Sequence, residues 1–195
     1  MEKINNVLIV VDVQNDFVTG SLGSSKEAEA ILPRVNELIN SDEFDIKLFT
    51  LDTHDCNYLE TTEGTNLPVI HCIKGTWGWE PAFDMSNLSN DQLIEKRQFG
   101  TTDIEFSIFD KLAEIYKIDL VSRRRYFDRP TTRITIVGLC TDICVISNAL
   151  ILKAQLKNSQ IICDASACAG TTPEMHKAAL DVMRSCQISV INSEE

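Results

Sequence analysis

The chain has 195 residues, of which 44 % are hydrophobic and 24 % are charged, a balance that suits one compact domain with a sizeable core. Its formal net charge of −11 argues against a nucleic-acid or anionic-membrane surface as a partner, and no apolar run approaches the length of a membrane span. Seven cysteines, an odd number without the spacing of a disulfide framework, indicate a reducing compartment, so we expect a cytoplasmic protein. The isolated basic triplet Arg123–Arg125 is expected to be a solvated loop.

Hydrophobic periodicity predicts strands that alternate with helices along the whole chain. Short apolar runs predict strands at Val7–Val13, Ile46–Asp52, Leu93–Glu95, 134–138, Gln160–Cys163 and Ile188–Ile191. Helical spacing or helix-start signals predict helices at Glu27–Ile39, from the capping box at Thr102 to Tyr116, from Ile143 to about Lys157, and from Thr172-Pro173 onward. This alternation predicts a single α/β domain over residues 1–195, with a mostly parallel sheet and helices on both faces.

Three reactive side chains fall where predicted strands end or lead into a helix. Asp12 interrupts the first apolar run, Lys96 follows the third strand, and Cys144 lies in the first turn of the helix after the fourth strand. Because parallel strands place their carboxyl ends along one edge of a sheet, these three residues can converge there. Asp12 would then be either a catalytic base or a loop cap, and Lys96 would either stabilise a nearby thiolate or remain solvated.

The segment Ile134–Ile146 turns from a strand into a helix at Gly138, with Cys144 in the first helical turn. Unpaired backbone N–H groups and the positive end of the helix dipole gather in such a turn and favour a thiolate, the nucleophilic form of cysteine. Cys144 is therefore a candidate nucleophile, and a small buried hydrophobe is the alternative interpretation. A redox pair with Cys140 is a weaker hypothesis, because the spacing differs from Cys-x-x-Cys.

A second polar group follows the strand at 46–52. Asp52 and His54 would face the same side of an extended chain, and Glu60, Glu63 and His71 come soon after. Nitrogen and oxygen ligands of this kind suit zinc, iron or manganese, whereas hydrogen-bonded or exposed histidines are the alternative.

Two aromatic features and one histidine remain. Trp77 and Trp79 lie in a Gly-rich loop, where they either line a pocket or pack the loop onto the core. His176 has no partner in view on the last predicted helix and is expected to be exposed.

Five motifs occur together in one order. They are Val-Asp-Val-Gln-Asn-Asp-Phe at 11–17, Asp-Thr-His at 52–54, His-Cys-Ile-Lys-Gly-Thr-x-Gly at 71–78, Lys-x-x-Phe-Gly at 96–100 and Gly-x-x-Thr-Asp-x-Cys-Val at 138–145. Over nearly the whole chain this set resembles the isochorismatase-like cysteine hydrolases, and within them the nicotinamidase branch. The resemblance implies a three-layer, doubly wound, six-stranded and mostly parallel sheet.

The resemblance also implies a catalytic triad of Asp12, Lys96 and Cys144. The reaction it implies is hydrolysis of nicotinamide to nicotinate and ammonia through a thioester on Cys144. Backbone N–H groups of Cys140 and Cys144 would hold the oxyanion, next to a cis peptide bond between Leu139 and Cys140.

For the metal, the resemblance implies one divalent ion bound by Asp52, His54 and His71. Glu63 is our choice for the variable fourth ligand, with Glu60 or water as the alternative. Zinc is the first expectation, and iron or manganese would also suit these ligands.

For the substrate pocket, the resemblance implies that Phe17 lines the nicotinamide ring. Pro68 stands where several relatives have a tryptophan, and we expect Trp77 to supply the second wall instead.

Other functions remain open at this point. The same triad could cleave another small amide, such as a ureido or carbamoyl compound, or a metal-bound water could replace the cysteine as nucleophile. A binding module without activity is a further alternative, as is assembly into a homo-oligomer, since relatives are often oligomers.

Overall fold

The computed structural model describes residues 4–23, 26–86, 88–89, 92–117 and 132–193, so the triplet Arg123–Arg125 lies outside the described residues. Its six strands form one sheet in the order β3-β2-β1-β4-β5-β6, and every neighbouring pair is parallel. The strands are β1 (Asn5–Val11), β2 (Ile46–Asp52), β3 (Leu93–Lys96), β4 (Thr132–Leu139), β5 (Gln160–Ala169) and β6 (Ser189–Ile191). The strand order changes direction between β1 and β4, which confirms the predicted doubly wound sheet.

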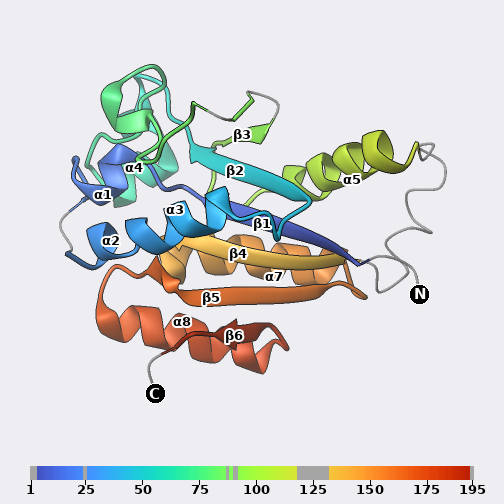
Figure 1. Ribbon diagram of the computed structural model, residues 1–195. Coiled ribbons are helices and arrows are strands. Elements are labelled where there is room, and N and C mark those ends of the chain that lie inside the picture. Colours follow the sequence, from blue (N-terminus) through green and yellow to red (C-terminus); the bar gives the residue numbers. More distant parts are fainter. Residues whose placement is uncertain (1–3, 24–25, 87, 90–91, 118–131, 194–195) are drawn as a thin grey trace.

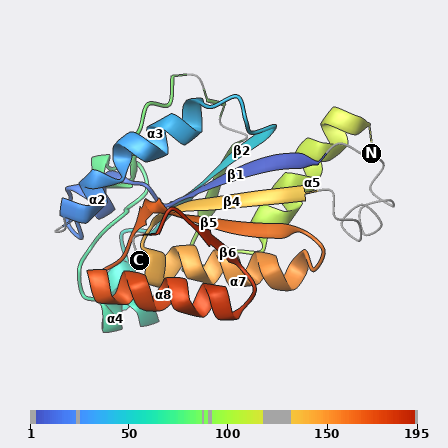
Figure 2. The ribbon, with the colours of Figure 1, turned by 60° about the horizontal axis from the view of Figure 1, so that its bottom comes forward.

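Helices cover both faces of this sheet. Figure 2 shows α2 and α3 over one face and α7 and α8 over the other. The helices are α1 (Asn15–Val18), α2 (Lys26–Ala30), α3 (Leu32–Asn40), α4 (Thr62–Asn66), α5 (Asp103–Tyr116), α7 (Ile146–Gln155) and α8 (Pro173–Ser185). The helix predicted at 27–39 is divided into α2 and α3, and Pro33 lies in the first turn of α3, where its missing N–H costs nothing. Within the described ranges, no helix is both long and apolar enough to cross a bilayer.

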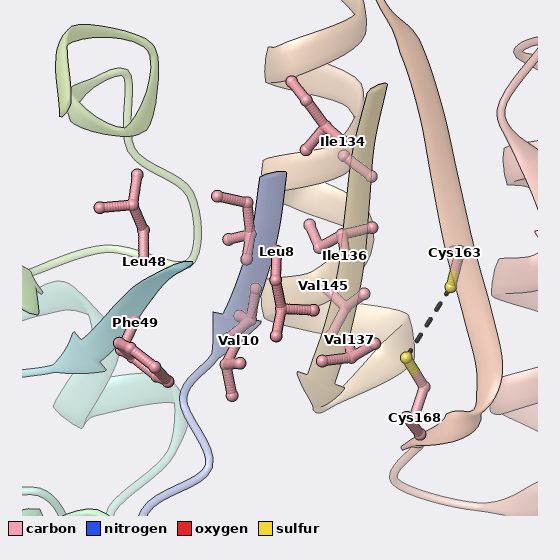
Figure 3. Close-up of a cluster of buried hydrophobic side chains, with 14 of the residues drawn as sticks. Leu8, Val10, Leu48, Phe49, Ile134, Ile136, Val137, Val145, Cys163 and Cys168 are labelled. Atoms are coloured by element: carbon pink, nitrogen blue, oxygen red, sulfur yellow. Dashed lines mark hydrogen bonds between the residues drawn. The ribbon is translucent and has the colours of Figure 1, made fainter. Parts of the chain in front are cut away.

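The core lies on both faces of the central strands. Figure 3 shows apolar side chains of β1, β2 and β4 packed together, among them Leu8, Leu48 and Ile136. These side chains are fully buried, which explains why apolar residues predominate in the sequences of the central strands. Burial of each such side chain contributes roughly 1.5–3 kcal/mol to the free energy of unfolding.

One strand differs from its prediction. β5 continues to Ala169, although the small and polar residues after Cys163 predict a loop. The register shifts opposite Val137, because Ile136 pairs with Cys163 while Gly138 pairs with Cys168. The sulfur atoms of Cys163 and Cys168 lie 3.8 Å apart at this bulge (Figure 3). The strand therefore resumes pairing at the level where β4 ends.

The carboxyl ends of the strands face the loops that carry the sequence motifs. Figure 1 shows α1 and α4 gathered at this edge of the sheet, at the left of the view. In an open α/β sheet, the crevice at the reversal of strand order is the usual place for a ligand. Here that crevice lies beyond the ends of β1 and β4.

Candidate active site

Asp12, Lys96 and Cys144 converge at the carboxyl edge of the sheet. Asp12 directly follows β1, Lys96 ends β3, and Cys144 lies in a π-helical turn, Thr141–Val145, between β4 and α7. The Lys96 Nζ atom lies 2.6 Å from Asp12 Oδ2 and 3.6 Å from Cys144 Sγ. Asp12 is 0 % exposed, Lys96 3 % and Cys144 5 %, so the three groups interact with little screening by water.

The backbone around these residues is specialised for close approach. Asp12 has a positive φ of 48°, and its Oδ1 accepts a hydrogen bond from the Thr50 hydroxyl at 2.7 Å. Gly138 has a φ of 122°, and a Cβ atom there would lie 2.1 Å from the carbonyl oxygen of Val11. Only glycine therefore lets the end of β4 lie this close to the end of β1. The cis peptide bond expected between Leu139 and Cys140 is present.

The electrostatic environment of Cys144 differs from the local prediction. Burial raises the pKa of its thiol well above the ordinary value, and the charge of Asp12 adds to this effect while Lys96 opposes it. Burial likewise raises the pKa of Asp12 against the opposing influence of Lys96. For Lys96, burial disfavours the ammonium form, but Asp12 and Cys144 outweigh burial and raise the pKa. The resting pair is therefore Asp12 with Lys96, and the thiol keeps its proton until a base removes it.

Asp52 belongs to two groups at once. Its Oδ1 accepts a hydrogen bond from Lys96 Nζ at 3.3 Å, and its Oδ2 lies 3.0 Å from His54 Nε2 and 3.5 Å from His71 Nε2. Burial opposes ionisation of Asp52, but its hydrogen bonds to both histidines outweigh burial and lower the pKa. The carboxylate thus joins the triad to a cluster of possible metal ligands.

Four ligand atoms from Asp52, His54, Glu63 and His71 lie within 4.8 Å of one another. The Nδ1 atom of His71 lies 2.8 Å from the carbonyl oxygen of Val69, which can only accept, so Nδ1 carries a proton and Nε2 is the ring nitrogen that faces the cluster, where it can bind a metal ion once it gives up the proton that it donates to Asp52.

Glu63 and Glu60 differ in their surroundings. Glu63 Oε1 is buried without a hydrogen-bond donor, and burial and the charge of Asp52 raise the pKa of Glu63. A divalent cation would give the buried Oε1 atom a partner and would offset the repulsion between Glu63 and Asp52, so the residues present fit a metal. Glu60 is exposed and does not belong to the cluster. Glu63, which lies in the first turn of the short helix α4, does belong to it.

A cavity of about 270 Å³ lies beside Cys144 and the metal-ligand cluster. Cys144, Asp52, Glu63 and His71 line its polar side. The rest of the wall is mostly apolar and comprises Phe17, Leu22, Ala28, Leu67, Phe99, Leu139, Cys140, Ile143, Gly170 and Thr171. Such a shape suits a small flat ligand with polar groups at one side.

The prediction for Trp77 is wrong. Its side chain is 58 % exposed in a short turn, Trp77–Trp79, and it does not line the cavity. Phe17, by contrast, lines the cavity and meets the His71 ring edge to face, with ring centroids 5.6 Å apart. Phe99, from the motif at 96–100, is the other aromatic residue that lines the cavity. Trp79 packs against the loop instead, and its Nε1 donates to Thr53 Oγ1 at 2.9 Å.

Several positioning contacts were not predicted from the sequence. Gln14 holds Asp52 from both sides, because its Nε2 donates to the Asp52 carbonyl at 2.9 Å and its Oε1 accepts from the Asp52 N–H at 2.7 Å. Gln14 lies two residues after Asp12 in the first motif, and this position is the sequence signal that could have identified it as a positioning residue. His176, expected to be exposed, is half-buried, and its Nδ1 lies 2.7 Å from the Thr141 hydroxyl.

Comparisons with known proteins give a consistent picture. The model of the isochorismatase domain family matches residues 6–195. A nicotinamidase of Acinetobacter baylyi is 30 % identical over 184 residues, which cover 85 % of this chain and 83 % of that protein. Among solved structures, a nicotinamidase/pyrazinamidase of Bacillus subtilis has a TM-score of 0.74 and 26 % identity, covering 96 % of this chain and 99 % of that one. A pyrazinamidase of Pyrococcus horikoshii in complex with zinc has a TM-score of 0.73 and 25 % identity, covering 97 % and 99 %. The chain therefore belongs to the isochorismatase domain family, in its nicotinamidase branch.

Proposed function

We propose that this protein is a nicotinamidase, which hydrolyses nicotinamide to nicotinate and ammonia through a thioester on Cys144. One observation carries the proposal: the Cys144 thiol, which lies 3.6 Å from Lys96 of the Asp12–Lys96 ion pair, lines one small cavity together with the metal-ligand candidates Asp52, Glu63 and His71. Nicotinamide has an amide for the first group and a ring nitrogen for the second. The nicotinamidase names of relatives that share most of this chain's length support the same substrate.

The reaction begins with proton transfer from Cys144 to Asp12 as the sulfur attacks the amide carbon. Asp12 is suited to this role, because burial raises its pKa and so makes it a stronger base than an exposed carboxylate. The developing thiolate is stabilised by Lys96, whose ammonium lies 3.6 Å from the sulfur. The oxyanion is held by the backbone N–H groups of Cys140 and Cys144, and loss of one such donor typically costs on the order of a hundredfold in rate.

Collapse of the tetrahedral intermediate breaks the C–N bond, and Asp12 returns its proton to the departing ammonia. The acyl group then remains on Cys144 as a thioester. Asp12 next accepts a proton from an attacking water molecule, and the carboxylic acid and the free thiol are released. One amide and one water thus yield one acid and one ammonia.

Asp52, His54, Glu63 and His71 would hold one divalent ion, which supplies a Lewis-acidic position for the pyridine nitrogen and so orients the ring. Zinc is the ion we propose, because imidazole and carboxylate ligands suit it and the Pyrococcus horikoshii pyrazinamidase was crystallised with zinc. Iron and manganese are compatible with the same ligands. Phe17 would contact the ring face beside His71.

An ammonia-release assay tests the proposal directly. Nicotinamide and pyrazinamide should be hydrolysed by the metal-loaded protein, whereas aliphatic and ureido amides of similar size should react far more slowly. Treatment with a chelator should weaken turnover of the pyridine and pyrazine amides, and re-addition of zinc should restore it. Faster hydrolysis of ureido compounds than of nicotinamide would reject the substrate assignment while retaining the triad.

We also propose that the protein is cytoplasmic and that residues 1–195 form a single domain. All seven cysteines fall in the described residues and are free thiols, as expected in a reducing compartment. Assembly into a homo-oligomer stays a proposal that sedimentation analysis can test.

A further inference from the structure

Asn148 makes an unusual set of contacts one helical turn after Cys144. It is buried on α7, and its Nδ2 donates to the carbonyl of Cys144 at 2.8 Å and to the carbonyl of Phe99 at 3.1 Å. Its Oδ1 accepts the backbone N–H of Thr101 at 2.9 Å. Two carbonyls can only accept and one N–H can only donate, so these partners fix the orientation of the amide. Both donor hydrogens and the acceptor oxygen are therefore used.

These contacts join the helix that carries Cys144 to the loop that follows Lys96. The loop residue Gly100 lies directly against α7, because a Cβ atom at Gly100 would lie 2.6 Å from Ile151 Cδ1 and 3.2 Å from Ser147 Cβ. The loop is thus held by hydrogen bonds on either side of a glycine that permits close approach. Asn148 supplies the hydrogen bonds on both sides of that contact.

The loop matters because Phe99 lines the substrate cavity together with Cys144 and Phe17. Phe99 is 45 % exposed, so packing of its side chain alone holds it less firmly than a core residue is held. Its position relative to the sulfur of Cys144 depends on the backbone, and Asn148 connects the carbonyls of both residues.

We propose that Asn148 is a positioning residue that holds Phe99 as the second aromatic wall of the substrate cavity. The inference rests on the proposed hydrolysis of a pyridine amide. It assigns to the Phe99–Thr101 loop the role of binding the ring, separate from the groups that perform the chemistry.

Asn148→Ser is the informative variant. A serine hydroxyl in a helix can still bond the carbonyl four residues earlier, here that of Cys144, but it is too short to reach the loop. We expect KM for nicotinamide to rise about tenfold while kcat changes by less than about twofold, because the lost contact binds the ring and not the reacting atoms. Phe99→Ala should raise KM to a similar extent. Adding Asn148→Ser to Phe99→Ala should cause little further change, since both variants remove the same wall.

Hydrogen–deuterium exchange supplies a readout that does not require turnover. The Thr101 amide bonds to Asn148 Oδ1, so the peptide spanning residues 97–102 should exchange faster in Asn148→Ser. Gln155→Ala is the matched control, because it removes an amide contact of the same helix, from Gln155 Nε2 to Glu105 at 3.1 Å. That control should leave KM and the exchange of 97–102 unchanged. If Asn148→Ser does not fold, Gly100→Val crowds the Ser147 side chain and the backbone of α7 with Asn148 intact, so it pushes the same loop away from the helix and should reproduce the rise in KM.

Two results would overturn the inference. One is unchanged exchange at 97–102 in Asn148→Ser, or in Gly100→Val where that variant replaces it. The other is a decrease in kcat alone, with KM unchanged, in Asn148→Ser, and full addition of this decrease to the effect of Phe99→Ala in the double variant. A wild-type protein without activity on any pyridine amide would instead overturn the proposed function, and the exchange data would still decide whether Asn148 holds the loop.

Discussion

Replacement of Lys96 by methionine should destabilise the protein more than replacement of its partner Asp12 by asparagine. Lys96 lies 2.6 Å from Asp12 and 3.3 Å from Asp52, and all three side chains are buried. Lys96→Met leaves two carboxylates facing each other without a cation, whereas Asp12→Asn leaves Lys96 paired with Asp52. Removal of one member of a buried ion pair typically costs about 3–5 kcal/mol, because the remaining charge stays desolvated.

The magnitude can be measured by urea denaturation of the metal-free protein at pH 7, followed by tryptophan fluorescence. For Lys96→Met we expect a loss of about 3–5 kcal/mol in the free energy of unfolding, equivalent to a decrease in Tm of roughly 6–20 °C for a chain of this size. Asp12→Asn should lower the free energy of unfolding by clearly less than Lys96→Met does. The double variant should be more stable than Lys96→Met alone, because it removes one of the two facing carboxylates.

The reasoning is refuted if Lys96→Met and Asp12→Asn destabilise the protein equally and their effects add in the double variant. Such a result would mean that the pair is not energetically coupled in solution. Both single variants should also lose at least about a hundredfold in kcat, because each removes a group that assists proton transfer from Cys144.

Three further predictions concern single residues. Cys144→Ala should abolish turnover while nicotinamide still binds in a calorimetric titration, and retained turnover would reject the thioester route. His71→Ala should lower the affinity for zinc by about tenfold or more in a chelator competition, whereas an unchanged affinity would remove His71 from the ligand set. Burial lowers the pKa of His176, so the unfolded chain binds more protons at that position and the free energy of unfolding should fall as the pH drops below about 6.5. His176→Gln should make this fall shallower between pH 7 and pH 5, and an identical slope in both proteins would contradict the assignment.

The sequence alone predicts most of the architecture, because its signals are local. The run Val7–Val11 is apolar at every position, which is typical of a strand covered on both faces, and Ile46–Asp52 has a mainly apolar sequence; both form strands. The motif order also places Asp12, Lys96 and Cys144 at strand ends. Because parallel strands share their carboxyl edge, convergence of these residues follows from the topology.

β5 shows where local signals fail. Its second half, Asp164–Ala169, has the composition of a loop, yet it resumes pairing with β4 after a bulge. Asp164 holds that bulge through Ser166 and through Arg34 of α3, which is 130 residues away in sequence. A prediction made from the residues near β5 in the sequence therefore cannot take Arg34 into account.

The protonation of Cys144 and the walls of the cavity were likewise decided by tertiary structure. The helix start favours a thiolate at Cys144, but burial and the charge of Asp12 raise the pKa of the thiol instead. Trp77 has the right chemistry for a ring wall but is 58 % exposed, whereas Phe99 lines the cavity and accepts a hydrogen bond from Asn148 at its carbonyl oxygen. The sequence by itself determined which groups are present and at which edge of the sheet they lie. Their charge state and contacts depend on desolvation and on partners distant in sequence, which exist only once the chain has folded.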